Sequence, residues 1–234
     1  MRNQDRPRKN QHIVVAIDGP AASGKSTVAR NLAQRLGFAY VNSGAMYRAL
    51  TWDILRSGID PRDHAAIGNY VGHARIVCDL HNKESRIFVN DLDPSEHLRD
   101  DNVNKSVSLV SSVPRVREVL VEKMRRYARN CDLVMEGRDI GSVVFPDTPF
   151  KFYIDALPDV RLRRRAAEGH RDEIATRDLA DSLRRASPLV MAKDAELIDT
   201  SNLSAEDVVT EIASRLQTKG LRVAGPRQAG QPLL

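Results

Sequence analysis

The amino-acid sequence predicts an α/β fold with a parallel central sheet. Short apolar runs rich in β-branched residues alternate along the chain with helix-length amphipathic patterns, and this alternation is typical of βαβ units. The run at residues 12–17 leads directly into a glycine-rich loop and a helical pattern, as at the start of such a unit. A chain of 234 residues is long enough for one domain of this kind with an inserted subdomain.

Five strands account for the apolar runs, and each ends in a polar residue. The runs cover residues 12–18, 38–43, 131–136, 149–155 and 195–200, and they end at Asp18, Ser43, Glu136, Asp155 and Thr200. In an open parallel sheet, ligands bind at the carboxyl ends of the strands. We therefore expect the chemistry of this protein at these residues and in the loops that follow them.

The segment between the second and third strands, residues 44–130, is too long for a simple crossover and is expected to contain an insert at about residues 60–113. The elements expected in the segment are a helix at 45–57, a hairpin of strands at 75–80 and 85–89, and helices at 94–113 and 114–129 that each open with a proline. Residues 159–185 form a charge-dense helical stretch, and Ser204 to Asp207 resemble the capping-box start of a last helix.

The glycine-rich loop after the first strand has the pattern G-x-x-x-x-G-K-[ST], which binds phosphate groups. Its residues are Gly19, Pro20, Ala21, Ala22, Ser23, Gly24, Lys25, Ser26 and Thr27. Loop N–H groups and the positive end of the following helix would point at one anion. Lys25 would reach the β- and γ-phosphates and the Ser26 hydroxyl would face Mg²⁺. The pattern predicts a nucleoside triphosphate site without specifying the reaction.

Two further clusters follow the second and third strands. Ser43 and Gly44 are expected to begin a helix whose N-terminus could bind an anion, and Arg48 lies about one turn after this start. A capped helix with an arginine on its surface would have the same sequence pattern. After the third strand, Arg138 and Asp139 adjoin at the carboxyl edge of the sheet. Glu136 either lies near the metal or accepts backbone hydrogen bonds, and both readings stay open.

A fourth cluster lies in the charge-dense stretch. Arg177, Asp181 and Arg184 are spaced i, i+4 and i+7, which places them on one helix face. Spacing alone favours a solvated, charged face over a binding site, because such pairs are common on helix surfaces.

Composition narrows the classes of protein. Residues 1–11 and 218–234 each carry a charge of +3, so the residues between them carry −1 of the total of +5. The basic surplus is therefore expected in two disordered tails, which argues against a nucleic-acid-binding surface.

No apolar run is long enough for a membrane span. Cys78 and Cys131 are expected to be reduced and buried in a cytoplasmic protein.

In this order, the motifs resemble the bacterial cytidylate kinase family, from about Ile13 to Leu216. The matching stretches are Ile17–Ser26, Ser43–Arg48, Ser108 with Pro114–Arg117, Gly137–Gly141 with Val144–Asp147, and Arg177, Asp181 and Arg184 with Ser187–Leu189. The resemblance implies a P-loop nucleoside-monophosphate-kinase-like, three-layer fold with five parallel strands. It also implies a kinase domain at residues 12–217, with a monophosphate-binding insert and a lid at about 161–177. The sequence does not give the oligomeric state, and we expect a monomer.

The resemblance also implies a reaction and a role for each matching residue. ATP would phosphorylate CMP or dCMP with Mg²⁺ present. Gly19 to Thr27 would hold ATP; Ser43, Gly44, Arg48, Arg138 and Arg184 would surround the acceptor phosphate; Ser108, Arg117 and Asp139 would read cytosine; and Arg177 and Asp181 would hold the sugar hydroxyls. Lys25, Arg48, Arg138 and Arg184 would act in catalysis. Replacing Asp139 by alanine should then abolish cytosine preference while ATP binding survives.

The lid departs from the family pattern. Only eleven residues separate Arg165 from Arg177, which is shorter than usual in the family, so Arg164, Arg165 or Arg171 would have to supply the lid arginines.

Two other functions stay open: a P-loop kinase for UMP or AMP, and a non-catalytic nucleotide-binding protein that uses its basic tails. A GTPase is disfavoured because Asn82–Ser85 lacks the last aspartate of the N-K-x-D motif.

Overall fold

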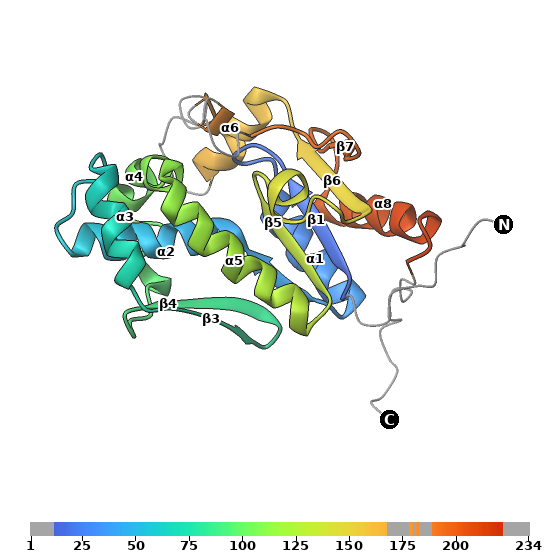
Figure 1. Cartoon of the computed structure of the whole chain (residues 1–234). Helices are drawn as coiled ribbons and strands as arrows, with labels where there is room; N and C mark the ends of the chain where they lie inside the picture. The colour runs from blue at the N-terminus through green and yellow to red at the C-terminus, as the bar shows by residue number, and fades with distance from the viewer. Residues whose placement is uncertain (1–11, 168–177, 180, 183–188, 222–234) are drawn as a thin grey trace.

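A seven-stranded sheet forms the centre of the protein, with helices on both faces (Figure 1). The computed structural model describes residues 12–167, 178–179, 181–182 and 189–221. The strands are β1 (Val14–Asp18), β2 (Ala39–Asn42), β3 (Ile76–His81), β4 (Glu84–Val89), β5 (Leu133–Gly137), β6 (Phe150–Asp155) and β7 (Glu196–Asp199). The helices are α1 (Lys25–Leu36), α2 (Ser43–Arg56), α3 (His64–His73), α4 (Asp101–Ser112), α5 (Pro114–Asn130), α6 (Pro158–Ala167) and α8 (Ala205–Thr218).

The five predicted strands are confirmed, but the predicted sheet is too small. The strand order is β3-β4-β2-β5-β1-β6-β7, and the five predicted strands run parallel. The hairpin of β3 and β4 extends this sheet instead of standing apart from it. Strand β4 pairs in parallel with β2, where the Tyr40 N–H donates to the Lys83 carbonyl at 2.7 Å. Asn82 and Lys83 have φ of 50° and 63°, the left-handed conformation of a tight two-residue hairpin turn.

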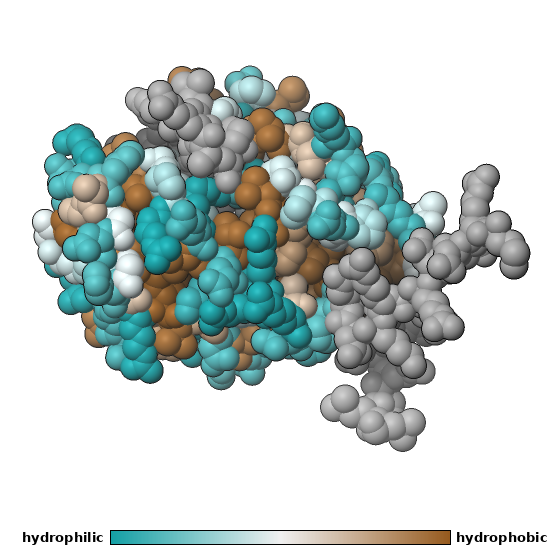
Figure 2. All heavy atoms as spheres, viewed as in Figure 1, coloured by the Kyte–Doolittle hydropathy of each residue, from teal (hydrophilic) through white to brown (hydrophobic). Residues whose placement is uncertain are grey.

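The central strands β1 and β5 bury both of their faces, and this produces three layers. Along β1, Val14 and Ala16 belong to the core beneath α2 and α5, whereas Val15 and Ile17 belong to the core beneath α1 and α8. All five β1 residues are buried, as expected for a central parallel strand. Residues on the outer surface are mixed, since the face drawn in Figure 2 shows hydrophilic residues interspersed with hydrophobic ones.

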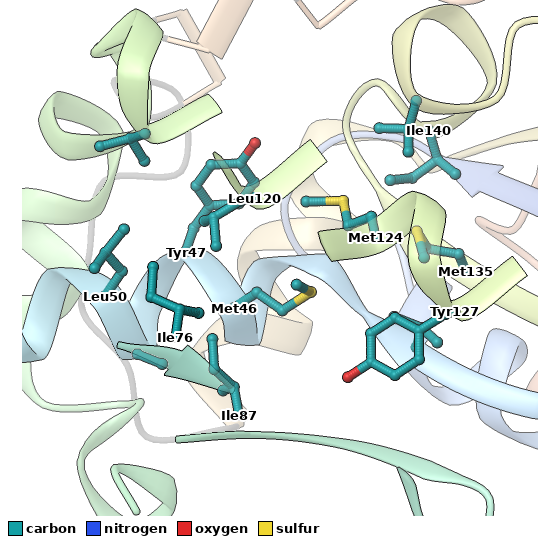
Figure 3. Close-up of a cluster of buried hydrophobic side chains, with 14 of the residues drawn as sticks. Met46, Tyr47, Leu50, Ile76, Ile87, Leu120, Met124, Tyr127, Met135 and Ile140 are labelled. Atoms are coloured by element: carbon teal, nitrogen blue, oxygen red, sulfur yellow. The ribbon is translucent and has the colours of Figure 1, made fainter. Parts of the chain in front are cut away.

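The core on one face of the sheet fixes helices α2 and α5, whose N-terminal parts lie near the carboxyl edge of the sheet. Figure 3 shows Met46 and Leu50 of α2 together with Leu120 and Met124 of α5, and Met135 of β5 lies in the same cluster. Each of these side chains is almost fully buried, and burial of one such side chain stabilises the fold by about 1.5–3 kcal/mol. The same helices carry Arg48 and Arg117, so core packing sets the positions of both arginines.

The helices begin where local capping allows, and these starts differ in part from the ones that the apolar pattern predicted. Pro114 begins α5, as predicted, but the helix predicted from residue 94 is wrong at its start. A single 3₁₀ turn follows Pro94, and α4 begins only at Asp101, because Asp100 has extended backbone angles that end any continuous helix. Helix α2 begins at Ser43, where the Asn42 side chain accepts the Ala45 N–H at 2.9 Å.

Two polar or aromatic contacts join α2 to the neighbouring segments. The ring of Trp52, on α2, stacks on His97 of the 3₁₀ turn, with ring centroids 5.1 Å apart and planes 9° from parallel. The next residue, Asp53, is fully buried and accepts hydrogen bonds from Tyr70 at 2.5 Å and Asn90 at 2.8 Å. The buried carboxylate of Asp53 therefore ties α2 to α3 and to the end of β4.

Both cysteines are free, as predicted, but they are half-buried rather than buried. Burial raises the pKa of the Cys78 thiol to about 11, which keeps it protonated. Within the described ranges, no helix combines the length and the apolar character that a membrane span requires.

Replacing Ser204 by alanine should lower the free energy of unfolding by about 1 kcal/mol. The Ser204 hydroxyl accepts the Asp207 N–H at 3.1 Å and the Asp207 carboxylate accepts the Ser204 N–H at 3.1 Å, so the predicted capping box of α8 is present. Urea denaturation measures the effect. Ser214→Ala on the exposed face of the same helix is the control, and an equal loss there would show that the cap contributes nothing specific.

Candidate active site

A cleft of about 290 Å³ opens at the carboxyl ends of β1, β2 and β5. Most of the predicted site residues meet there. Those that line it are Ala21, Ala22, Gly24, Lys25, Ser26, Thr27, Ser43, Gly44, Arg48, Ser108, Arg117, Arg138, Asp139 and Asp181. Gly19, Pro20 and Ser23 shape the loop without lining the cleft, and Arg177, Arg184 and Arg171 lie outside the described residues.

The phosphate-binding loop owes its shape to two glycines. Gly19 has φ of 150°, and a Cβ there would overlap the Ile154 carbonyl, so no other residue fits. Gly24 has φ of 91° and forms the N-cap of α1 without any side-chain cap. The first N–H groups of α1 are therefore left to bind an anion. Lys25 is buried at the same point, where its Nζ donates to the Pro20 carbonyl at 2.7 Å.

Glu136 faces the loop, and its carboxylate accepts hydrogen bonds from two hydroxyl groups. The Ser26 hydroxyl donates to Glu136 Oε1 at 2.7 Å, and the Tyr40 hydroxyl donates to the same oxygen at 3.2 Å. Burial, followed by the charge of Glu136, raises the pKa of Tyr40, so this phenol stays protonated as a donor. A hydroxyl and a carboxylate oxygen side by side are ligands of the kind that Mg²⁺ prefers. No group of three or more acidic, histidine or cysteine residues could hold a metal within the described ranges.

Arg117 and Asp139 form a buried ion pair at the base of the cleft. Both side chains are 6% exposed, and Arg117 Nη2 donates to Asp139 Oδ2. Arg117 also lies over the Tyr47 ring, 5.5 Å from its centroid. A buried guanidinium and a buried carboxylate at one point provide donors and an acceptor in a fixed arrangement.

Arg138, although adjacent to Asp139 in sequence, joins a different set of charges. Its Nε donates to Asp181 Oδ2 at 2.9 Å and its Nη1 donates to the Gly19 carbonyl at 2.7 Å. Ser108 donates to the other oxygen of Asp181 at 3.2 Å. Asp181 is only 2% exposed, so this residue belongs to a buried network and not to the solvated face that spacing alone favoured.

Arg48 lies against the N-terminus of α2. A Cβ at Gly44 would lie 2.8 Å from Arg48 Nη1, so glycine leaves room for this guanidinium beside the backbone. The Ser43 hydroxyl donates to the Glu136 carbonyl at 2.8 Å, which joins the start of α2 to the end of β5. Arg48 and Arg138 therefore line one cleft with Lys25, as the sequence predicted.

Two arginines of α6, together with Asp178, clamp the loop; the sequence offered Arg164 only as a lid arginine, and Arg161 was missed. The Asp178 carboxylate pairs with Arg161 and accepts the Ala21 N–H at 3.0 Å. Arg164 donates to the carbonyls of Ser23 at 3.3 Å and Thr200 at 2.7 Å. Of the arginines considered for the short lid, Arg164 thus binds backbone, while Arg165 lines the cleft. The density of arginine after residue 160 was the available signal, but spacing could not assign partners.

Three further cleft residues carried no sequence signal. They are Arg30 on α1, Asn104 on α4, and Arg99 just before α4. Asp18, at the end of β1, is buried behind the cleft and accepts the N–H groups of Ile140 and Gly141. Burial raises the pKa of Asp18 to about 7, against the opposite effect of these two hydrogen bonds. The Asp18 carboxyl group therefore titrates close to neutral pH, and its ionised form accepts both hydrogen bonds.

A phosphate-binding loop and several arginines that line one cleft at the carboxyl edge of a parallel sheet define a P-loop phosphotransferase. The family model described as cytidylate kinase matches residues 15–218. The chain belongs to the cytidylate kinase family.

Curated relatives agree over most of the chain. A cytidylate kinase from Caldanaerobacter subterraneus subsp. tengcongensis is 43% identical over 224 residues, which are 90% of this chain and 98% of the relative. One from Mycobacterium leprae is 44% identical over 212 residues, 86% of this chain and 93% of the relative. A bifunctional pantoate ligase/cytidylate kinase from Prochlorococcus marinus is 40% identical over 221 residues, 88% of this chain but 42% of the relative.

Proposed function

We propose that this protein transfers the γ-phosphoryl group of ATP to CMP or dCMP and produces ADP with CDP or dCDP. The observation that carries the proposal is the buried Arg117–Asp139 pair, which lies in the same cleft as the phosphate-binding loop. Membership of the cytidylate kinase family supports it. A donor pocket and an acceptor pocket that share one cleft can hold the two reacting groups together.

ATP binds at the loop in this proposal. The loop from Gly19 to Thr27 and the N-terminus of α1 hold its phosphates, and Lys25 reaches the β- and γ-phosphates. Ser26 and Glu136 are the residues that would hold Mg²⁺, because their oxygens lie 2.7 Å apart at the cleft wall. The metal supplies charge neutralisation for the transferred phosphoryl group. Tyr40 orients the Glu136 carboxylate by donating to it.

The acceptor monophosphate binds opposite the loop. Ser43, Gly44, Arg48 and Arg138 surround its phosphate, and arginine suits this task because its planar fork binds phosphate oxygens in pairs. We assign Arg184 to the same phosphate and Arg177 with Asp181 to the sugar hydroxyls. The buried network of Asp181 with Ser108 and Arg138 supports a position for Asp181 between base and phosphate.

The reaction needs no general base. The second pKa of a phosphate monoester is about 6, so the acceptor is largely ionised at neutral pH. Positioning and charge neutralisation are therefore the main contributions of the protein. The cationic side chains that line the cleft, Lys25, Arg48 and Arg138, supply them.

Base choice follows from the order of donors and acceptors. Cytosine presents an N4 amino donor beside the acceptors N3 and O2. The Asp139 carboxylate accepts from N4, while Arg117 donates to the acceptor side, and Ser108 lies on the same wall of the cleft. Uracil would place O4 against the carboxylate and leave buried groups unpaired, at a cost of roughly 1–3 kcal/mol each.

An assay of ADP release with ATP, Mg²⁺ and each common nucleoside monophosphate tests the proposal. CMP and dCMP should give kcat/KM values at least about tenfold above those for UMP and AMP. Equal or better turnover of UMP or AMP would favour a kinase for another monophosphate. No turnover of any monophosphate, together with tight binding of polyanions, would favour a non-catalytic nucleotide-binding protein.

We also propose that the protein acts as a cytoplasmic monomer without a specific nucleic-acid partner. Support for the last point comes from the charge of −1 on the residues between the two basic tails.

A further inference from the structure

Asp18 joins the phosphate-binding loop to the turn that carries Asp139. It is the last residue of β1 and is 5% exposed. Its Oδ1 accepts the Ile140 N–H at 2.8 Å and its Oδ2 accepts the Gly141 N–H at 2.7 Å. Both carboxylate oxygens are thus used on consecutive N–H groups of the residues that directly follow Asp139.

The turn at residues 137–141, which leads from β5 into a short π-helix (Ile140–Val144), contacts the end of β1 at other points as well. Strands β1 and β5 place Asp18 beside Gly137, and Arg138 Nη1 donates to the Gly19 carbonyl at 2.7 Å. On the other side of the turn, a Cβ at Gly141 would lie 3.1 Å from the side chain of Lys151 and 3.4 Å from Asp18 Oδ2. The packing leaves the turn little room to shift while Asp18 stays in place.

We propose that Asp18 is a positioning residue for the acceptor base, because it fixes the backbone that presents Asp139 and Arg138 to the cleft. The inference rests on the proposed function and adds a residue to it. Asp18 does not line the cleft itself, so its effect on the base must pass through this turn. A carboxylate suits this position because one N–H faces each of its two oxygens, and both oxygens are acceptors.

The variant Asp18→Asn separates this role from a general one in the loop. Asparagine keeps the size of the side chain but turns an NH₂ group toward one of the two backbone N–H groups, so one hydrogen bond is lost. We expect the KM for CMP to rise about tenfold and the preference for CMP over UMP to fall by a similar factor. The KM for ATP should change by less than about twofold, since the loop N–H groups do not bond to Asp18.

Two further variants guard against a misleading result. Asp53→Asn alters a carboxylate that is equally buried but lies outside the cleft, so its CMP preference should match that of the wild type even if its unfolding midpoint falls. Gly141→Ala crowds the same turn from the Lys151 side and should reduce the CMP preference in the same direction as Asp18→Asn. It provides the test if Asp18→Asn does not fold.

The outcomes separate this inference from the proposed function. Wild-type protein without CMP-dependent ADP release would overturn the function. An active wild type with unchanged CMP over UMP preference in Asp18→Asn, or in Gly141→Ala where that variant alone folds, would overturn the role of Asp18. An equal rise in the KM for ATP and CMP would also overturn it, since that result would mean that Asp18 supports the loop rather than the turn.

Discussion

Lys25→Met should lower kcat with saturating ATP and CMP by about 10²–10³-fold, the loss typical of one preorganised charge at a phosphoryl or oxyanion site. Methionine keeps the length and the apolar stem of the buried side chain, so the fold should be kept. The charge that neutralises the β- and γ-phosphates would be removed. Single-turnover measurements of ADP formation give the chemical step directly.

Lys83→Met is the matched control for Lys25→Met. Its Nζ also donates to a backbone carbonyl, that of Gly37, at 2.7 Å, but it lies in the hairpin turn outside the cleft. The control should retain wild-type kcat. Activity within a few-fold of the wild type in Lys25→Met would contradict the assignment of the loop as the ATP site.

Asp139→Ala should remove cytosine preference. It should also lower the free energy of unfolding by roughly 3–5 kcal/mol, because it leaves the buried Arg117 guanidinium without the carboxylate that neutralises it. The stability effect follows from the buried pair with Arg117 and could not be anticipated from sequence. Urea denaturation measures it, and kcat/KM for CMP and UMP at a temperature where the variant is folded measures the preference. ATP binding, measured by titration calorimetry on the folded variant, should survive.

A double variant separates the two effects of Asp139→Ala. Arg117→Met combined with Asp139→Ala removes both charges and should recover part of the lost stability without recovering CMP turnover. Glu118→Ala breaks an exposed pair with Arg115 and should leave the unfolding midpoint nearly unchanged. Full cytosine preference in folded Asp139→Ala would show that another residue reads the base.

The donor half of the site could be predicted from sequence because its signals are local. The glycines, Lys25 and Ser26 lie within nine residues, between a strand and a helix that their own patterns reveal. The backbone angles of Gly19 and Gly24 are required by that short loop in any surroundings. Sequence also identified the residues of the acceptor half, through family resemblance, and the cleft brings together those that the structure describes.

The partners within the acceptor half could not be predicted, because they depend on tertiary packing. Arg138 and Asp139 are neighbours in sequence, yet one pairs with Asp181 and the other with Arg117. The hairpin was recognised, but its place in the sheet depends on tertiary contacts, such as the pairing at Tyr40 and the packing of Ile87 in the core, that leave no periodic signal. Asp18 was noted only as the end of a strand, since nothing local shows that two N–H groups from residues 140 and 141 would face it.

The stacked pair of Trp52 and His97 gives this protein a built-in optical probe. Trp52 is the sole tryptophan of the chain, so its emission reports on one place. It lies on the helix that carries Arg48, while His97 immediately precedes the segment that leads to Arg99 and Ser108. Any displacement of that segment against α2 when a nucleotide enters changes the overlap of the two rings. Intrinsic fluorescence would report such a displacement without any label attached.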